Sequence, residues 1–193
     1  YFSDPRYVGD EPRELEYRAV YRMNLDGSVE EVTHDVAKPN GLALSPDEKT
    51  LYVADHDNGT DKIDPEKDPP EPGPMKIYAF PLDPDGRVAG ARRTLVDFGS
   101  HSGCDGMTVD ARGRIYLTVR SLAQPGVMVI NPKGRQVAFL PTGPPNQQSG
   151  ETAGLPSNVE FGLGEELDVL YVTMDTSLYR IRLNARGYHR QYK

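Results

Sequence analysis

The segment that decides the fold is KPNGLALSPDEKTLYVAD, which runs from Lys38 to Asp55. An asparagine lies between a proline and a glycine, and two apolar stretches separated by Ser-Pro-Asp-Glu follow it. Alternation of apolar and polar residues predicts strands, and the Pro-Asp segment between them predicts a tight turn. The segment therefore indicates two antiparallel strands with Asn40 at their first end.

This pattern occurs three times, at 40–55, 105–120 and 157–175. In each copy a polar residue at an opening turn precedes a short strand, and a second strand of the form Leu/Ile-Tyr-Val/Leu follows. YFSD at residues 1–4 resembles the second strand of a fourth copy. Self-similarity of this kind indicates a repeat architecture. Three tyrosines recur in phase and are expected to pack between repeats: Tyr52, Tyr116 and Tyr171.

Each copy is followed by a second pair of strands, with glycine after a charged residue at the turn. These predicted hairpins cover 19–33, 76–88, 126–140 and 177–189. The unit is thus about four strands at a spacing of roughly 50–65 residues, which is typical of propeller blades. We predict an all-β fold, a β-propeller in a single domain over 1–193. About four blades are expected here, some of them partial, with further blades before Tyr1 because the chain opens in what resembles mid-strand.

Composition narrows the function. The chain has 22 basic and 29 acidic residues, a net charge of −7, which disfavours a nucleic-acid surface or a basic membrane-surface helix. No apolar run approaches the ~20 residues of a membrane span, so we expect a soluble protein. The compartment, cytoplasmic or periplasmic/secreted, stays open, as does the oligomeric state. The one cysteine, Cys104, excludes an internal disulfide and a cysteine-based zinc site, and it is expected to be packed rather than nucleophilic.

Three polar residues fall at the first end of successive copies: Asn40, Asp105 and Asn158. Equivalent positions of successive blades meet around the central channel, so their oxygens would surround one point. Hard cations such as Ca²⁺ prefer carboxylate and amide oxygens. The alternative is ordinary turn chemistry, because Asn or Asp before Gly favours a turn. His56 and His101 are further candidates for a rim that binds sugar hydroxyls, with a plain surface loop as the alternative.

KPNGLALSPDEKTLYVAD, GCDGMTVDARGRIYLTV and LPSNVEFG followed by LYVTMDTSLYRIRL resemble the gluconolactonase group of the SMP-30/gluconolactonase/LRE (regucalcin) family, over essentially the whole chain. The resemblance implies a six-bladed propeller with one divalent metal in the channel, most often Ca²⁺, with Zn²⁺, Mn²⁺ or Mg²⁺ as alternatives. It implies Asn40 and Asp105 as metal ligands, and a Glu ligand and sugar-binding Arg and Asn residues upstream of Tyr1. Asn158 matches a channel-facing position, and Asp10 and Glu11 fall where some relatives carry a substrate-facing Glu.

The resulting functional prediction is hydrolysis of a sugar lactone, such as glucono-1,5-lactone, by metal-activated water, with Asp105 as ligand and proton acceptor. Two alternatives stay open. One is a non-catalytic propeller that binds a protein or carbohydrate, because one fold hosts many functions. The other is a paraoxonase-like or strictosidine-synthase-like esterase.

Overall fold

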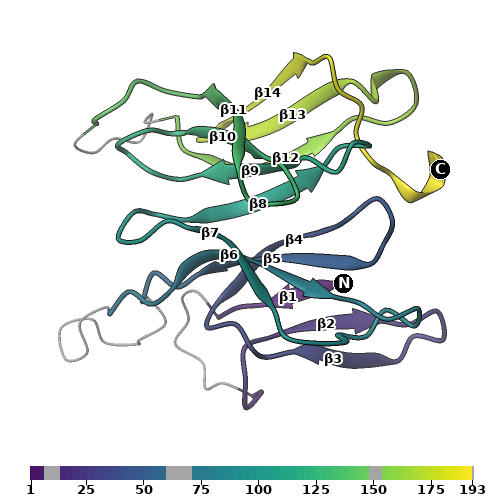
Figure 1. Ribbon diagram of the computed structural model, residues 1–193. Helices are drawn as coiled ribbons and strands as arrows, with labels where there is room; N and C mark the ends of the chain where they lie inside the picture. The colour runs from purple at the N-terminus through teal and green to yellow at the C-terminus, as the bar shows by residue number, and fades with distance from the viewer. Residues whose placement is uncertain (7–13, 60–70, 148–153, 193) are drawn as a thin grey trace.

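The computed structural model describes residues 1–6, 14–59, 71–147 and 154–192. These residues form four antiparallel sheets, which follow one another in chain order and stack face against face (Figure 1). The first sheet holds β1 (Phe2–Asp4), β2 (Ala19–Met23) and β3 (Val29–Thr33). The second holds β4 (Pro39–Leu44), β5 (Thr50–His56), β6 (Met75–Pro81) and β7 (Arg93–Asp97).

The third sheet holds β8 (Cys104–Val109), β9 (Ile115–Val119), β10 (Gly126–Ile130) and β11 (Gln136–Pro141). The fourth holds β12 (Pro156–Phe161), β13 (Val169–Met174) and β14 (Ser177–Arg182). Short 3₁₀ turns lie at Gly164–Glu166 and Arg190–Tyr192. The all-β prediction is confirmed, and so are the repeated units of up to four strands.

Five tight turns join consecutive strands or strand ends with the same geometry. The fourth residue of each donates its N–H to the first residue's carbonyl, and in four turns it is a glycine with φ between +76° and +84°: Gly27, Gly86, Gly113 and Gly134. Glycine suits this left-handed conformation because it has no Cβ. The hairpins at 19–33, 76–88 and 126–140 thus form largely as the sequence predicts, although β7 itself begins further on, at Arg93.

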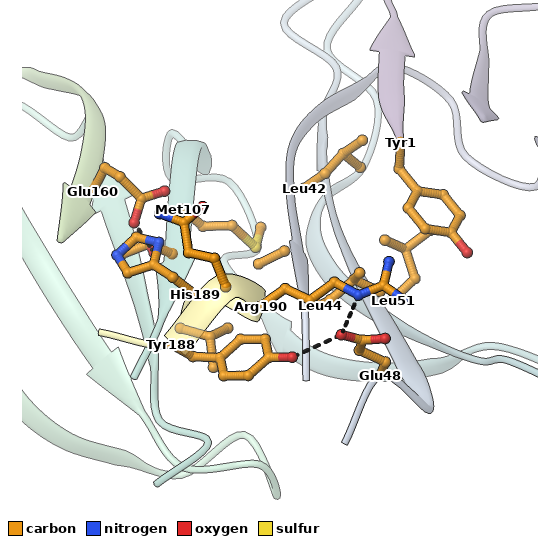
Figure 2. Close-up of a pocket in the computed structure, with 14 residues that line it drawn as sticks. Tyr1, Leu42, Leu44, Glu48, Leu51, Met107, Glu160, Tyr188, His189 and Arg190 are labelled. Carbon is orange, nitrogen blue, oxygen red and sulfur yellow. Dashed lines mark hydrogen bonds and ion pairs between the residues drawn. The ribbon is translucent and has the colours of Figure 1, made fainter. Parts of the chain in front are cut away.

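The fifth turn has Glu48 in the glycine position, with φ +56°. A non-glycine residue rarely adopts this conformation without a compensating contact. The Glu48 carboxylate accepts a hydrogen bond from the Tyr188 hydroxyl (2.8 Å) and lies 3.5 Å from Nε of Arg190 (Figure 2). The side chain of Glu48 therefore ties the C-terminal segment to the second sheet.

The predicted hairpin at 177–189 is wrong in its second half. After β14 the chain leaves its own sheet, and Gly187 forms a bridge with Asp110 of the third sheet. A Cβ on Gly187 would overlap the side chain of Phe161, so its glycine serves a close approach rather than a hairpin turn.

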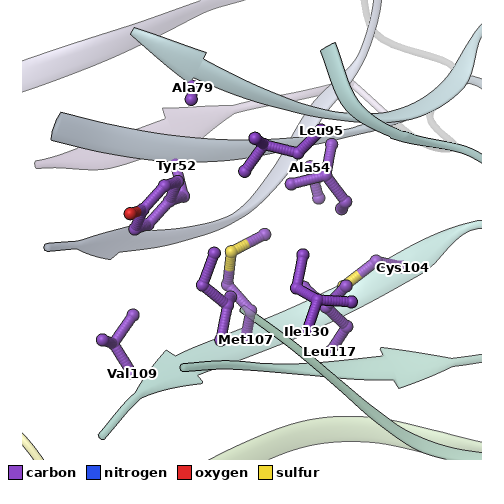
Figure 3. Packing of buried hydrophobic residues seen from close by; sticks show 11 residues of the cluster. Tyr52, Ala54, Ala79, Leu95, Cys104, Met107, Val109, Leu117 and Ile130 are labelled. Atoms are coloured by element: carbon purple, nitrogen blue, oxygen red, sulfur yellow. The ribbon is translucent and has the colours of Figure 1, made fainter. Parts of the chain in front are cut away.

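Three apolar clusters fill the three spaces between the four sheets. Figure 3 shows the middle one, in which Tyr52 and Ala54 of the second sheet face Met107 and Leu117 of the third. The neighbours of Tyr52 along β5, Leu51 and Val53, point the other way into the cluster with the first sheet. Successive side chains of a strand point to opposite faces, so a strand buried on both faces is continuously apolar.

The in-phase tyrosines behave as predicted where the next sheet is present. Tyr52 packs between the second and third sheets, and Tyr116 packs edge-on against Phe161 between the third and fourth (ring centroids 5.0 Å apart). Burial and a bond to Asp110 raise the pKa of Tyr116 to about 12, with burial as the larger cause. Tyr171 is half-buried, and its hydroxyl donates to Glu166.

The first strands of three sheets lie side by side, with β4 against β8 and β8 against β12. Each contains a β-bulge close to its start. The pairing of β4 with β5 shifts by one residue at Asn40 and Gly41, and that of β8 with β9 shifts at Asp105 and Gly106. Neither glycine has positive φ, so the predicted opening turns are bulged strands instead. A bulge re-aims a side chain and bends its strand.

The two bulge glycines allow the close approach of these strands. A Cβ on Gly41 would overlap the carbonyl oxygen of Asp105, and a Cβ on Gly106 would overlap the side chain of Asn158. The contact at Gly41 is with rigid backbone and leaves no room for even a methyl group, whereas a Cβ on Gly106 would require the side chain of Asn158 to move.

We expect Gly41→Ala to lower the free energy of unfolding by about 3 kcal/mol or more, because overpacking against backbone forces the two strands apart. Urea unfolding followed by circular dichroism measures the change. Gly103→Ala is the matched control, since its Cβ would overlap no backbone atom: the nearest atoms are Sδ of Met75 at 3.3 Å and the Cα of Met75 at 3.6 Å. Equal effects of the two substitutions would contradict a special role for Gly41.

Candidate functional site

The candidate site lies where the bulges of β4 and β8 meet. Asn40 and Asp105 are both half-buried, and their side chains are hydrogen-bonded to each other. Because the carboxylate of Asp105 lies next to the amide of Asn40, an oxygen from each side chain can reach a common ligand. The structure therefore brings together the two residues that the repeat pattern aligned.

The surroundings of the Asp105 carboxylate shift its pKa in both directions. Burial raises its pKa above the usual range for an aspartate. Arg120, the hydrogen bond from Asn40 and the nearby His56 act in the other direction. A carboxylate with a raised pKa is a stronger base than an exposed one, which suits it to accept a proton.

His56 is the last residue of β5 and is buried, so it lies in a strand rather than in the predicted surface loop. Its Nδ1 lies 3.0 Å from the carbonyl oxygen of Cys104, in the neighbouring sheet. A carbonyl can only accept, so Nδ1 carries the proton. Burial lowers the pKa of His56, and the neutral ring then presents Nε2 as an acceptor. His56 thus links the second sheet to the residue before Asp105.

Lys38 and Asp55 form a buried polar support beneath Asn40. The Asp55 carboxylate accepts from the backbone N–H of Lys38 (2.8 Å) and of Ala37 (3.1 Å). Nζ of Lys38 donates to Oδ1 of Asn58 (2.7 Å). Burial lowers the pKa of Lys38 and raises that of Asp55. Buried polar groups with partners of this kind fix the backbone that carries Asn40.

The other predicted site residues lie differently. In β12 the extra residue of the bulge is Ser157, which follows the last paired residue as Asn40 and Asp105 do. Asn158 is one residue further along, exposed, with its Oδ1 accepting from its neighbour's N–H (2.8 Å). The alignment of Asn158 with Asn40 is therefore wrong by one position, because β12 has Ser157 where β4 has Asn40, and Asn158 where β4 has Gly41.

His101 is exposed in the turn after β7, where its N–H donates to the carbonyl of Phe98 (3.1 Å). It is not among the groups whose charge shifts the pKa of Asp105. Asp10 and Glu11 lie outside the described residues. Substrate binding by Asn158, His101, Glu11 and His56 stays a prediction.

Sequence reasoning missed Arg120 and Lys38. Nε of Arg120 lies 3.7 Å from Oδ2 of Asp105, and the charges of both basic residues act on His56. A usable signal was present, because Arg120 follows the second strand of its copy at the same phase as His56.

The pocket in Figure 2 lies further along the same strands. It has a volume of about 370 Å³ and is lined by Leu42 and Leu44 of β4, Met107 of β8, Glu160 of β12 and the C-terminal segment around His189. Its lining includes neither Asn40 nor Asp105, so the candidate site is defined by its side-chain contacts and not by this cavity.

Within the described ranges, no group of three or more His, Cys, Asp or Glu side chains could hold a metal ion. An Asn–Asp pair still offers the hard oxygen donors that Ca²⁺ prefers, with other ligands from water or from elsewhere. The described part of the chain also contains no helix of the length and apolarity needed to span a membrane.

A family model described as the SMP-30/gluconolactonase/LRE-like region matches residues 1–176. The chain belongs to this family. It is similar to a gluconolactonase from Zymomonas mobilis, which is 27% identical over 198 residues, 97% of this chain and 48% of the relative. The chain spans about half the length of that curated relative.

Two solved structures extend the comparison. A gluconolactonase from Xanthomonas campestris, described as important in glucose secondary metabolic pathways, has a TM-score of 0.65 and 28% identity. The match covers 90% of this chain and 47% of that one. Regucalcin from Agrobacterium tumefaciens, a calcium-binding protein, has a TM-score of 0.61 at 19% identity, over 89% and 54% of the two chains. These neighbours confirm the propeller-type fold, while the number of blades stays a prediction.

The structure predicts an inert thiol beside Asp105. Cys104 is fully buried, burial raises its pKa, and its Sγ lies 3.3 Å from the carbonyl oxygen of Gly106. We therefore expect no reaction with Ellman's reagent in the folded protein and complete reaction in urea, because the thiolate is the reactive species. Rapid labelling of the folded protein would show that Cys104 is accessible and reactive.

Proposed function

We propose that the protein opens a sugar lactone to the aldonic acid, with a divalent metal ion, Ca²⁺ first among the candidates, held by Asn40 and Asp105. The adjoining side chains of these two residues at the β4–β8 junction are the observation that carries the proposal. Membership of a family that includes gluconolactonases supports the reaction class. The calcium-binding relative supports the choice of metal.

The donor set suits a hard cation. Asp105 contributes a negative charge, whereas the amide of Asn40 anchors the ion without neutralising it. A bound divalent ion acts as a Lewis acid on an ester carbonyl. In the described arrangement Asn40 donates to Asp105, so binding of a cation requires the amide of Asn40 to turn its oxygen toward the ion.

In the reaction, water adds to the lactone carbonyl carbon, the ring C–O bond breaks, and a proton passes from the water to the ring oxygen. Asp105 accepts this proton and returns it to the leaving oxygen. The neutral His56 holds the carbonyl of Cys104, which keeps the bulge that aims Asp105.

Asp105→Asn tests the base. We expect the rate of glucono-1,5-lactone hydrolysis by the full-length protein to fall by about 10²-fold or more, because an amide cannot accept the proton. Proton release in weak buffer measures the rate, and circular dichroism verifies the fold. Asp97→Asn is the control, since Asp97 is an exposed carboxylate on β7 paired with Lys76 (3.1 Å). A parental rate in Asp105→Asn would exclude Asp105 as the base.

Asn40→Ala tests the metal site without reference to turnover. We expect calorimetry to show weaker Ca²⁺ binding and a smaller rise in melting temperature on adding Ca²⁺ after EDTA treatment, because a ligand bound only by the folded state stabilises it. Unchanged Ca²⁺ affinity would contradict the role of Asn40. If the parent binds Ca²⁺ but hydrolyses no lactone, a non-catalytic binding propeller becomes the better description.

A further inference from the structure

Arg120 occupies a repeated position at the rim of the site. It follows β9 directly, as His56 ends β5, because Val119 pairs with Cys104 and Asp55 pairs with Pro39. The backbone agrees with this equivalence. The N–H of Arg120 donates to Gly103 (3.4 Å) as that of His56 donates to Lys38 (3.0 Å). The fold therefore places Arg120 between the third and fourth sheets at the position that His56 occupies between the second and third.

The guanidinium of Arg120 lies between two inner strands. Its Nε is 3.7 Å from Oδ2 of Asp105 on β8, and a terminal nitrogen donates to the carbonyl of Pro156 on β12 (3.4 Å). About a third of the side chain is exposed. A guanidinium has five N–H donors in a rigid fork, so a ligand can bind to it without breaking both anchors.

A divalent cation bound at Asn40 and Asp105 would raise the positive charge next to Arg120. The ion would bring two positive charges to a carboxylate that already faces Arg120, and Lys38 also acts on neighbouring His56. Excess positive charge in a partly buried site attracts an anion. Lactone hydrolysis supplies one, since the carbonyl oxygen becomes negative during attack and the product is a carboxylate.

We propose that Arg120 binds the acyl oxygen of the lactone and the carboxylate of the aldonate product, and so selects ligands that carry this group. The inference rests on the proposed lactonase function. An arginine suits the role because its fork matches the two oxygens of a carboxylate. The carboxylate would lie on the Arg120 side of Asp105, with the sugar hydroxyls reaching toward His56.

Binding of gluconate to the Ca²⁺-loaded full-length protein tests the inference by calorimetry. We expect Arg120→Gln to weaken gluconate binding about tenfold or more, the range typical of a lost hydrogen bond to a charged group. Ca²⁺ binding should persist or tighten, because a repelling charge is removed. Arg120→Lys should recover part of the affinity, since it keeps the charge but not the fork. Arg182→Gln, on exposed β14 beside Asp168, is the matched control.

Lactone hydrolysis measured on the same variants separates the two proposals. We expect Arg120→Gln to raise KM and to weaken inhibition by gluconate more than it lowers kcat. Parental gluconate affinity in Arg120→Gln, or no gluconate binding by the Ca²⁺-loaded parent, would overturn the inference. An active parent with an unaffected Arg120→Gln variant refutes the role of Arg120 and leaves the lactonase proposal standing. A parent that binds gluconate through Arg120 but hydrolyses no lactone refutes the lactonase proposal instead.

Discussion

The close contact of β4 with β8 is the constraint on which the site depends. A Cβ on Gly41 would overlap the backbone carbonyl of Asp105, so these two strands approach as closely as their backbones allow, while Gly106 leaves room for the side chain of Asn158 on β12. A side chain at position 41 would push β4 away from β8 and Asn40 away from Asp105. Asn40 and Gly41 therefore act together: Gly41 permits the close approach of the strands, and the bulge directs the side chain of Asn40 toward Asp105.

The inner strands could be predicted because they are buried on two faces. Burial on both sides gives β5 and β9 their largely apolar character, and four of the five tight turns place glycine at a left-handed position. The hairpin after β14 could not be predicted, since Gly187 serves a contact with Phe161 that joins segments distant in sequence. A glycine needed for space and one needed for a turn look the same in a sequence.

The site was predictable only in part for a similar reason. Asn40 and Asp105 were found because a repeat aligns them. Asn158 was placed one residue out, since a bulge changes the phase of a strand without leaving a mark in its composition. Arg120 and Lys38 escaped notice because isolated basic residues usually face solvent. Lys38 is fully buried, and nothing in the local sequence states that its neighbours can hold a charge away from water.

The turn at Glu48 has a further consequence for how the chain reaches this arrangement. Its left-handed backbone is unfavourable locally, whereas the bond that offsets it comes from Tyr188, 140 positions away. The left-handed backbone of Glu48 persists in the folded protein, and the contacts of its carboxylate with Tyr188 and Arg190 offset the cost. Long-range contacts of this kind form slowly because a large loop must close first. The β4–β5 hairpin and the C-terminal segment therefore stabilise each other through Glu48 and Tyr188.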